Sequence, residues 1–207
     1  MAHNETLQST HEHYDPIASK LGMWLFIFTE MLLFGAMFIV YSVYRYRHPV
    51  EFHLAAQELN LTIGFINTVI LLISSMTVAM SITALQLGNK KVSMILIGIT
   101  LLLALVFLVN KYFEWGAKIH HDIYPGSAFL MSLSKGDMLF FGLYFFMTGL
   151  HALHIIVGMA LLGVVFVKVK NGSVNQNRVS LLENGGLYWH LVDLIWIFLF
   201  PLFYLIH

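Results

Sequence analysis

The chain contains no cysteine, so neither disulfide bonds nor thiolate metal sites can contribute to its structure. Charge is also scarce, because only 11% of the 207 residues are Asp, Glu, Lys or Arg, and the formal net charge is zero. A chain without a net positive charge gives no indication of a nucleic-acid partner. Apolar residues make up 58% of the sequence and give it a mean hydropathy of +0.77. This balance indicates an integral membrane protein.

Five long apolar runs divide the sequence, and each can cross a bilayer as a helix, which takes about 20 residues. The first run has no small-residue cleavage site after a short core, so it is interpreted as a retained span and not as a signal peptide. The predicted fold is all-α, an integral membrane bundle of five transmembrane helices. We expect a polar leader over residues 1–18 and a single transmembrane domain over residues 19–207, with spans at 21–45, 61–87, 92–115, 138–168 and 187–206.

Five spans place the two termini on opposite sides of the membrane, and the basic residues indicate which side is which. Cytoplasmic loops carry an excess of Lys and Arg. The side with the N-terminus has six basic residues and the other side has four. The N-terminus is therefore predicted to be cytoplasmic and the C-terminus to lie outside. The six are Lys20, Lys90, Lys91, Lys168, Lys170 and Arg178, and the four are Arg45, Arg47, Lys118 and Lys135.

Ionisable side chains inside the spans are the candidate functional residues, because a polar group in hydrocarbon needs a partner. The fourth span carries His151 and His154 within residues 138–167, which contain no Asp, Glu, Lys or Arg, and the last span carries His190 and Asp193. At ~1.5 Å per residue, all four lie roughly 5–10 Å from the inner face. Residues three apart also share a helix face. The two pairs are therefore predicted to confront each other across the last two spans.

Two carboxylates lie apart from this predicted cluster. Glu30 is nine residues into the first span, ~14 Å deep, and Glu114 is at the outer end of the third span. At its depth, Glu30 either donates a hydrogen bond to a neighbouring helix or takes part in proton handling.

Three interpretations of the polar cluster compete. Two histidines and a carboxylate at one depth can hold a catalytic zinc or a non-haem iron, although a di-metal site requires more carboxylates. Intramembrane His, Asp and Glu also mark proton paths and transport sites, which would suit a stand-alone membrane transporter. In the third interpretation, imidazole–carboxylate hydrogen bonds lock two helices together. Spacing alone favours this structural role, with no catalytic residue and no metal ligand.

Four segments carry a specific resemblance to a known family. Residues 149–158, GLHALHIIVG, and residues 188–196, YWHLVDLIW, resemble the two signature helices of subunit III of the haem-copper terminal oxidases. Residues 29–34, TEMLLF, resemble the family's segment with a buried glutamate, and residues 112–114, YFE, resemble its second acidic position. These segments follow one another in the family's order over four of the five spans. The chain is therefore identified as a member of this family, in the short five-helix form found in bacteria.

The resemblance implies an accessory subunit that supports oxygen reduction and proton pumping by a catalytic subunit, as a non-catalytic part of a cytochrome c oxidase-type complex in the bacterial inner membrane. Such a subunit binds no redox centre, so haem and copper would lie in partner subunits, and phospholipid would be bound. The implied partners are subunit I, with subunit II and small subunits. By position, Glu30 would be the family's buried carboxylate, with a role in proton uptake or a lipid cleft. His151, His154, His190 and Asp193 would be structural.

The sequence also departs from its longer relatives. The first two spans of the seven-helix form have no counterpart here, so the V-shaped lipid cleft of that form is not implied. Lys111 stands where many relatives have an acid. Five-span forms occur in both cytochrome c and quinol oxidases, and Glu30 with residues 183–186, ENGG, is closer to the cytochrome c branch. A quinol oxidase subunit and a relative associated with nitric oxide reductase remain alternatives.

Overall fold

The computed structural model describes residues 16–176 and 178–206, so most of the polar leader predicted over residues 1–18 lies outside the described part. Within those residues the secondary structure is helical, and no strand is present. The helices are α1 (Pro16–Arg47), α2 (Pro49–Gln57), α3 (Leu61–Gln86), α4 (Lys90–His120), α5 (Ala128–Ser132), α6 (Lys135–Lys170) and α7 (Ser180–Tyr204).

Five of these helices, α1, α3, α4, α6 and α7, are long and apolar enough to span a membrane, which confirms the predicted all-α transmembrane bundle. The bounds of α3 and α6 fall within three residues of the predicted spans. The last helix differs most, because α7 begins at Ser180 and not at Leu187. This shift changes the depth of the polar residues that α7 carries.

Local sequence signals set several helix ends. Asn60 precedes α3, and its side-chain oxygen accepts a hydrogen bond from the Ile63 backbone N–H at 3.2 Å. Ser134 caps α6 in the same way, accepting from the Asp137 N–H at 3.2 Å. Pro49 occupies the first turn of α2, where its missing N–H costs nothing. The connection between the first two predicted spans therefore contains a short helix, which packs against α6.

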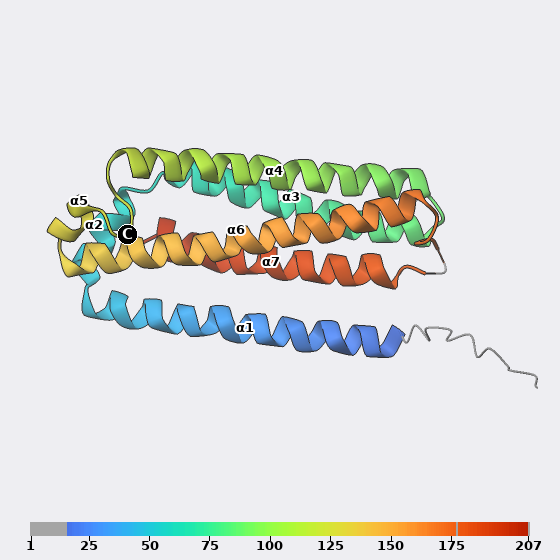
Figure 1. The fold of residues 1–207 in the computed structure, drawn as a ribbon, viewed down its shortest axis with the longest axis horizontal. Coiled ribbons are helices and arrows are strands. Elements are labelled where there is room, and N and C mark those ends of the chain that lie inside the picture. Colours follow the sequence, from blue (N-terminus) through green and yellow to red (C-terminus); the bar gives the residue numbers. More distant parts are fainter. Residues whose placement is uncertain (1–15, 177, 207) are drawn as a thin grey trace, which may run out of the picture.

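The helices α3, α4, α6 and α7 form a four-helix core in which each packs against two others, and α1 lies along the edge formed by α6 and α7 (Figure 1). Glycines permit the closest approaches. A Cβ atom at Gly64 of α3 would lie 2.7 Å from the Tyr204 ring, and one at Gly158 of α6 would lie 2.9 Å from the Trp189 ring. Small residues at such contacts are typical of membrane helices, because they let backbones approach closely.

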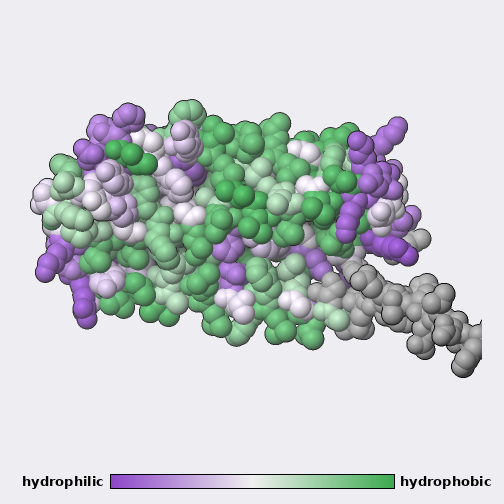
Figure 2. All heavy atoms as spheres, in the orientation of Figure 1, coloured by the Kyte–Doolittle hydropathy of each residue, from purple (hydrophilic) through white to green (hydrophobic). Residues whose placement is uncertain are grey.

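The surface is that of a multi-pass membrane protein. Figure 2 shows a broad apolar belt along the bundle, with hydrophilic residues concentrated at its two ends. The belt includes large side chains that a water-soluble protein rarely exposes in such numbers, among them Leu25, which is 60% exposed, and Leu102, which is 61% exposed. The helix α1 has the smallest buried share of the five spans, so its few polar contacts with the core matter most for its placement.

Candidate functional site

The predicted polar residues of α6 and α7 lie near the middle of their helices. His190 and Asp193 are close to the centre of Ser180–Tyr204, and His151 and His154 are at the centre of Lys135–Lys170. The predicted position of His190 and Asp193 near the inner face is thus corrected, because the last helix starts earlier than expected. Contacts between α6 and α7 place all four at one level, as the Tyr188 hydroxyl donates to the His154 carbonyl at 3.0 Å.

His154 pairs with Glu30, and this pair joins α6 to α1. The His154 Nε2 atom lies 2.9 Å from Glu30 Oε2, and the other ring nitrogen, Nδ1, donates to the Leu150 carbonyl at 2.7 Å. Both side chains are largely covered, with 12% of the His154 side chain and 15% of the Glu30 side chain exposed. The Phe34 ring of α1 packs edge-on against the imidazole, with 5.4 Å between centroids. Glu30 therefore joins α1 to α6 through a largely buried polar contact.

His151 takes no part in that pair. Its ring is fully buried between Trp196, at a centroid distance of 5.1 Å, and Phe107, at 5.7 Å. Among the described side chains and backbone groups, neither ring nitrogen has a hydrogen-bond partner. In this structure His151 is an aromatic packing residue at the centre of the core.

His190 and Asp193 face α3. The His190 Nδ1 atom lies 2.6 Å from the Ser75 hydroxyl oxygen, and the neighbouring Trp189 donates its indole N–H to Ser74 at 3.0 Å. Asp193 is only 3% exposed, and the same Ser75 hydroxyl is its polar neighbour, although no described group lies in good hydrogen-bond geometry to either carboxylate oxygen. These contacts join α7 to α3.

The structure therefore separates the two pairs that the sequence analysis brought together. All four residues lie near the middle of their helices, but the helices are rotated so that His154 faces α1 and His190 faces α3. Only His151 lies between α6 and α7, and it packs against an aromatic ring there. Glu30, which the sequence analysis treated alone, is the partner of His154.

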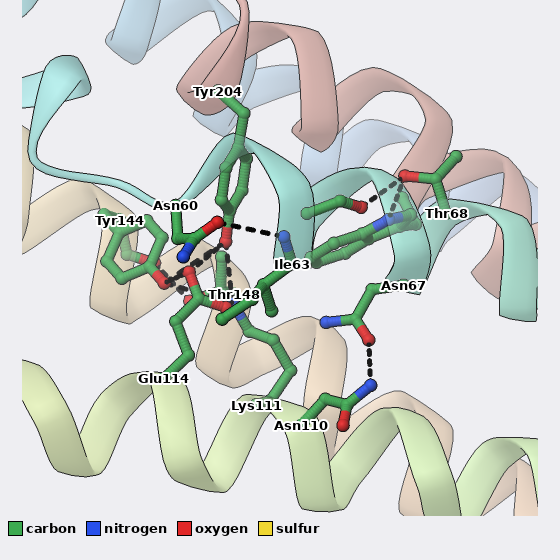
Figure 3. A network of polar contacts seen from close by, with 12 residues as sticks. Asn60, Ile63, Asn67, Thr68, Asn110, Lys111, Glu114, Tyr144, Thr148 and Tyr204 are labelled. Carbon is green, nitrogen blue, oxygen red and sulfur yellow. Dashed lines mark hydrogen bonds and ion pairs between the residues drawn. The ribbon is translucent and has the colours of Figure 1, made fainter.

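A second polar network, which the sequence analysis did not predict, surrounds Glu114 (Figure 3). Glu114 is 5% exposed, and its carboxylate accepts from Lys111 Nζ at 3.0 Å and from the Tyr144 hydroxyl at 2.8 Å. The Tyr204 hydroxyl donates to the same carboxylate. The outer-end acidic position is thus buried inside the bundle, where it ties α4 to α6 and to the end of α7.

The ammonium group of Lys111 is the cation of this network. It also donates to the hydroxyl oxygens of Tyr144 and Tyr204, at 3.1 and 3.0 Å. The rings of Trp115, Trp196 and both tyrosines lie within 6 Å of the nitrogen, so the aromatic faces add cation–π attraction. The sequence did contain a signal for the charge pair, because Lys111 and Glu114 are three apart on one helix.

These clusters join helices to one another. Among residues 16–176 and 178–206, no three His, Cys, Asp or Glu side chains are close enough together to hold a metal ion. Glu30 and Asp193 each have a polar side chain of another helix as neighbour. Lys111 and Glu114 contact each other within α4 and also contact tyrosines of α6 and α7. The arrangement suits interhelical attachment.

Comparison with known proteins agrees with this architecture. The family model described as cytochrome c oxidase subunit III matches residues 1–207. A probable quinol oxidase subunit 3 of Staphylococcus saprophyticus is 26% identical over 100% of this chain and 97% of its own length. A cytochrome c oxidase subunit 3 of Thermostichus vulcanus is 29% identical over 95% of this chain and 91% of its own.

A third relative is much longer than this chain. The haem-copper oxidase subunit I+III of Aeropyrum pernix is 29% identical over 98% of the chain, which corresponds to only 24% of that protein. The similarity thus covers one part of a larger polypeptide. With a family model that matches its whole length, the chain belongs to the cytochrome c oxidase subunit III family and is an accessory subunit of a haem-copper oxidase.

Proposed function

We propose that this chain supports oxygen reduction and proton pumping by a catalytic subunit without holding haem or copper itself. The observation that carries the proposal is that most of its intramembrane polar groups are bound to neighbouring side chains. Glu30 is bound to His154, Glu114 is bound to Lys111 and two tyrosines, and His190 is bound to Ser75. Redox centres need free imidazole, thiolate or carboxylate ligands that converge on one point, and these pairs are spread over three separate helix contacts.

The proposed partners are the subunits that carry the redox chemistry. We infer that subunit I binds this chain, because the Aeropyrum relative is named subunit I+III and this chain matches one part of it. Subunit II and small subunits complete the proposed complex, with haem and copper held there. Phospholipid is proposed to fill the apolar grooves beside α1, one of which is lined by Met23, Phe26 and Leu161 and has a volume of about 390 Å³.

We propose the inner membrane of a bacterium as the location, with the N-terminus cytoplasmic. The start of α1, the α3–α4 turn and the α6–α7 connection lie at one end of the bundle (Figure 1), and these segments carry more basic residues than the opposite end. An excess of Lys and Arg is typical of cytoplasmic segments.

The electron donor of the proposed complex is cytochrome c or a quinol. Cytochrome c is favoured by Glu30 and by the sequence ENGG over residues 183–186. The quinol alternative is supported by the Staphylococcus relative, which matches over the full length of the chain. Identifying the co-purified subunit that binds the donor distinguishes the two, because a cytochrome c oxidase carries a copper-binding motif there.

Purification of the oxidase with and without this chain tests the proposal. We expect the complex without it to keep its haem and copper per catalytic subunit, to reduce oxygen at first, and to lose activity sooner under turnover. Metal analysis and absorption spectra give the content, and oxygen consumption gives the lifetime. If haem or copper fell in proportion to the loss of this chain, the accessory role would be refuted.

A further inference from the structure

His190 presents a polar group at the outer surface of the bundle, at mid-membrane depth. The imidazole is half-buried, and its Nδ1 atom is occupied by Ser75 of α3. Among the described residues, none bonds to the Nε2 atom, and this atom is not enclosed by the bundle. Both residues lie close to the centres of their helices, α7 and α3. The nitrogen thus faces hydrocarbon unless something covers it.

The protonation of the ring follows from Ser75. The Ser75 hydroxyl has two polar neighbours, His190 and Asp193, and only His190 Nδ1, at 2.6 Å, lies in hydrogen-bond geometry to it, so we assign the hydroxyl proton to this nitrogen. The neutral imidazole then carries its own hydrogen on Nε2. That N–H points away from Ser75, so it can donate to a group outside this chain. An N–H left without an acceptor in lipid is costly.

The surface around this N–H has the character of a helix contact. On α3, Ser75 contacts His190, and by helical spacing Leu72, Ala79 and Thr83 share its face. Three of these four residues are small or carry a hydroxyl. On α7, Leu194 lies one turn from His190 on the same face. Leu72 is 47% exposed and Leu194 is 43% exposed, so this α3–α7 seam is uncovered. Small and hydroxyl residues allow a further helix to approach closely.

A buried carboxyl lies directly behind the seam. Asp193 is 3% exposed and has Ser75 as its polar neighbour, but no described group lies in good hydrogen-bond geometry to either oxygen. By contrast, the Glu30–His154 pair at the α1–α6 contact satisfies itself, since each group bonds the other. Unpaired polar atoms at this level are therefore found both in the core, at His151, and behind the seam, at Asp193.

We propose that the α3–α7 seam docks a transmembrane helix of another oxidase subunit, and that this helix presents a hydrogen-bond acceptor to His190 Nε2–H. A lipid tail offers no such acceptor, and the polar headgroups lie well away from the membrane centre. The helix provides a hydroxyl, carboxamide or carboxyl oxygen at the level of Ser75. This inference rests on the proposed function, because it takes the partner from the oxidase complex.

Site-specific photocrosslinking in the intact complex tests the contact. A photoreactive amino acid replaces Leu72 or Leu194 in the seam, or Leu105 as a matched control. Leu105 is 54% exposed at the centre of α4, a helix that does not belong to the seam. We expect both seam positions to capture another oxidase subunit. Adducts only with lipid, or only with a second copy of this chain, would overturn the proposal, as would capture of a subunit from Leu105 alone.

Two substitutions of His190 test the proposed donor. His190→Gln places an amide N–H near the Nε2 position, whereas His190→Asn keeps a group only near Nδ1. We expect the Asn variant to retain the partner subunit roughly three- to fifteen-fold less well, which is the range for one interhelical hydrogen bond in a membrane. The Gln variant should restore most of the binding, and the amount of this chain in the membrane controls for folding. Equal retention by both variants would refute the donor role.

Different results would refute the proposed function and the docking of a partner helix. If no oxidase subunit co-purified with the wild-type chain, the proposed function would be refuted. If oxidase subunits co-purified but the seam positions captured only lipid, the docking proposal alone would be refuted.

Discussion

Replacement of Glu114 by Leu should destabilise the bundle more than any other single change to its charges. The carboxylate neutralises Lys111, whose side chain is only 2% exposed and cannot reach water. Removing one partner of a buried ion pair costs about 3–5 kcal/mol, because the other charge is left uncompensated. Two tyrosine hydroxyls would still accept from the ammonium group. We therefore expect a loss near the lower end, about 3 kcal/mol.

A double-mutant cycle isolates the charge pair from the rest of the network. Lys111→Met should cost about 2 kcal/mol, since the carboxylate keeps two tyrosine donors. The double variant with Met at 111 and Leu at 114 should lose only about 1–2 kcal/mol, because a buried pair replaced by apolar groups is often nearly neutral. The coupling energy would then be about 3–4 kcal/mol.

Equilibrium unfolding of the chain in mixed detergent micelles, followed by circular dichroism, gives these free energies. Glu183→Gln is the control, because it breaks a surface ion pair with Lys20 whose side chains are 29% and 54% exposed. A pair of that kind contributes about 0–1 kcal/mol. If Glu114→Leu cost no more than this control, or if the double variant were as unstable as the sum of the single ones, the charge pair would not stabilise the core as argued.

Three further changes test the contacts of α1 and α6. Glu30→Ala should leave assembly of the oxidase intact but reduce the number of turnovers before inactivation, with Glu30→Gln as the milder control; an unchanged lifetime in oxygen-consumption traces would contradict a special role. Gly158→Leu should cost about 1–3 kcal/mol by overpacking against the α7 tryptophan ring, whereas Gly163→Leu, which meets open space, should leave the melting temperature unchanged. Tyr41→Phe removes a hydrogen bond to an α7 carbonyl, and the same unfolding assay should show a loss of about 1 kcal/mol.

The five spans were predictable because the membrane imposes one rule, a long apolar helix, on every crossing. The start of α7 was not predictable by that rule. Residues 183–186, ENGG, are typical of a loop in water, yet here they lie within a helix because the other helices pack against them. Glu183 accepts from Gln86 and pairs with Lys20, and Gly186 lets Ile82 of α3 approach closely. Glycine is also more frequent in membrane helices than in soluble ones.

The partners of the polar residues were less predictable than their depth. Position along a helix gives depth directly, at about 1.5 Å per residue. Which neighbour a side chain faces depends on rotation about the helix axis, and an amphipathic pattern that would reveal it is missing where a helix is apolar on all sides. This is the case for α6 around His151 and His154. The sequence thus predicted that His154 lies at the depth of His190 and Asp193, but it could not show that His154 faces Glu30 of α1.

The polar contacts between the helices suggest a structural reason for the importance of Glu30. The core helices are held by buried contacts along their length, and the Lys111–Glu114 network joins three of them toward one end of the bundle. The helix α1 has much less buried surface, so the Glu30–His154 bond at its middle contributes a larger share of its attachment. Weakening that bond would leave the four-helix core folded while α1 separates from it locally, since partial opening follows the least buried element. A Glu30 variant that assembles normally but inactivates early would therefore indicate loosening of α1 in the membrane, and not loss of a proton carrier.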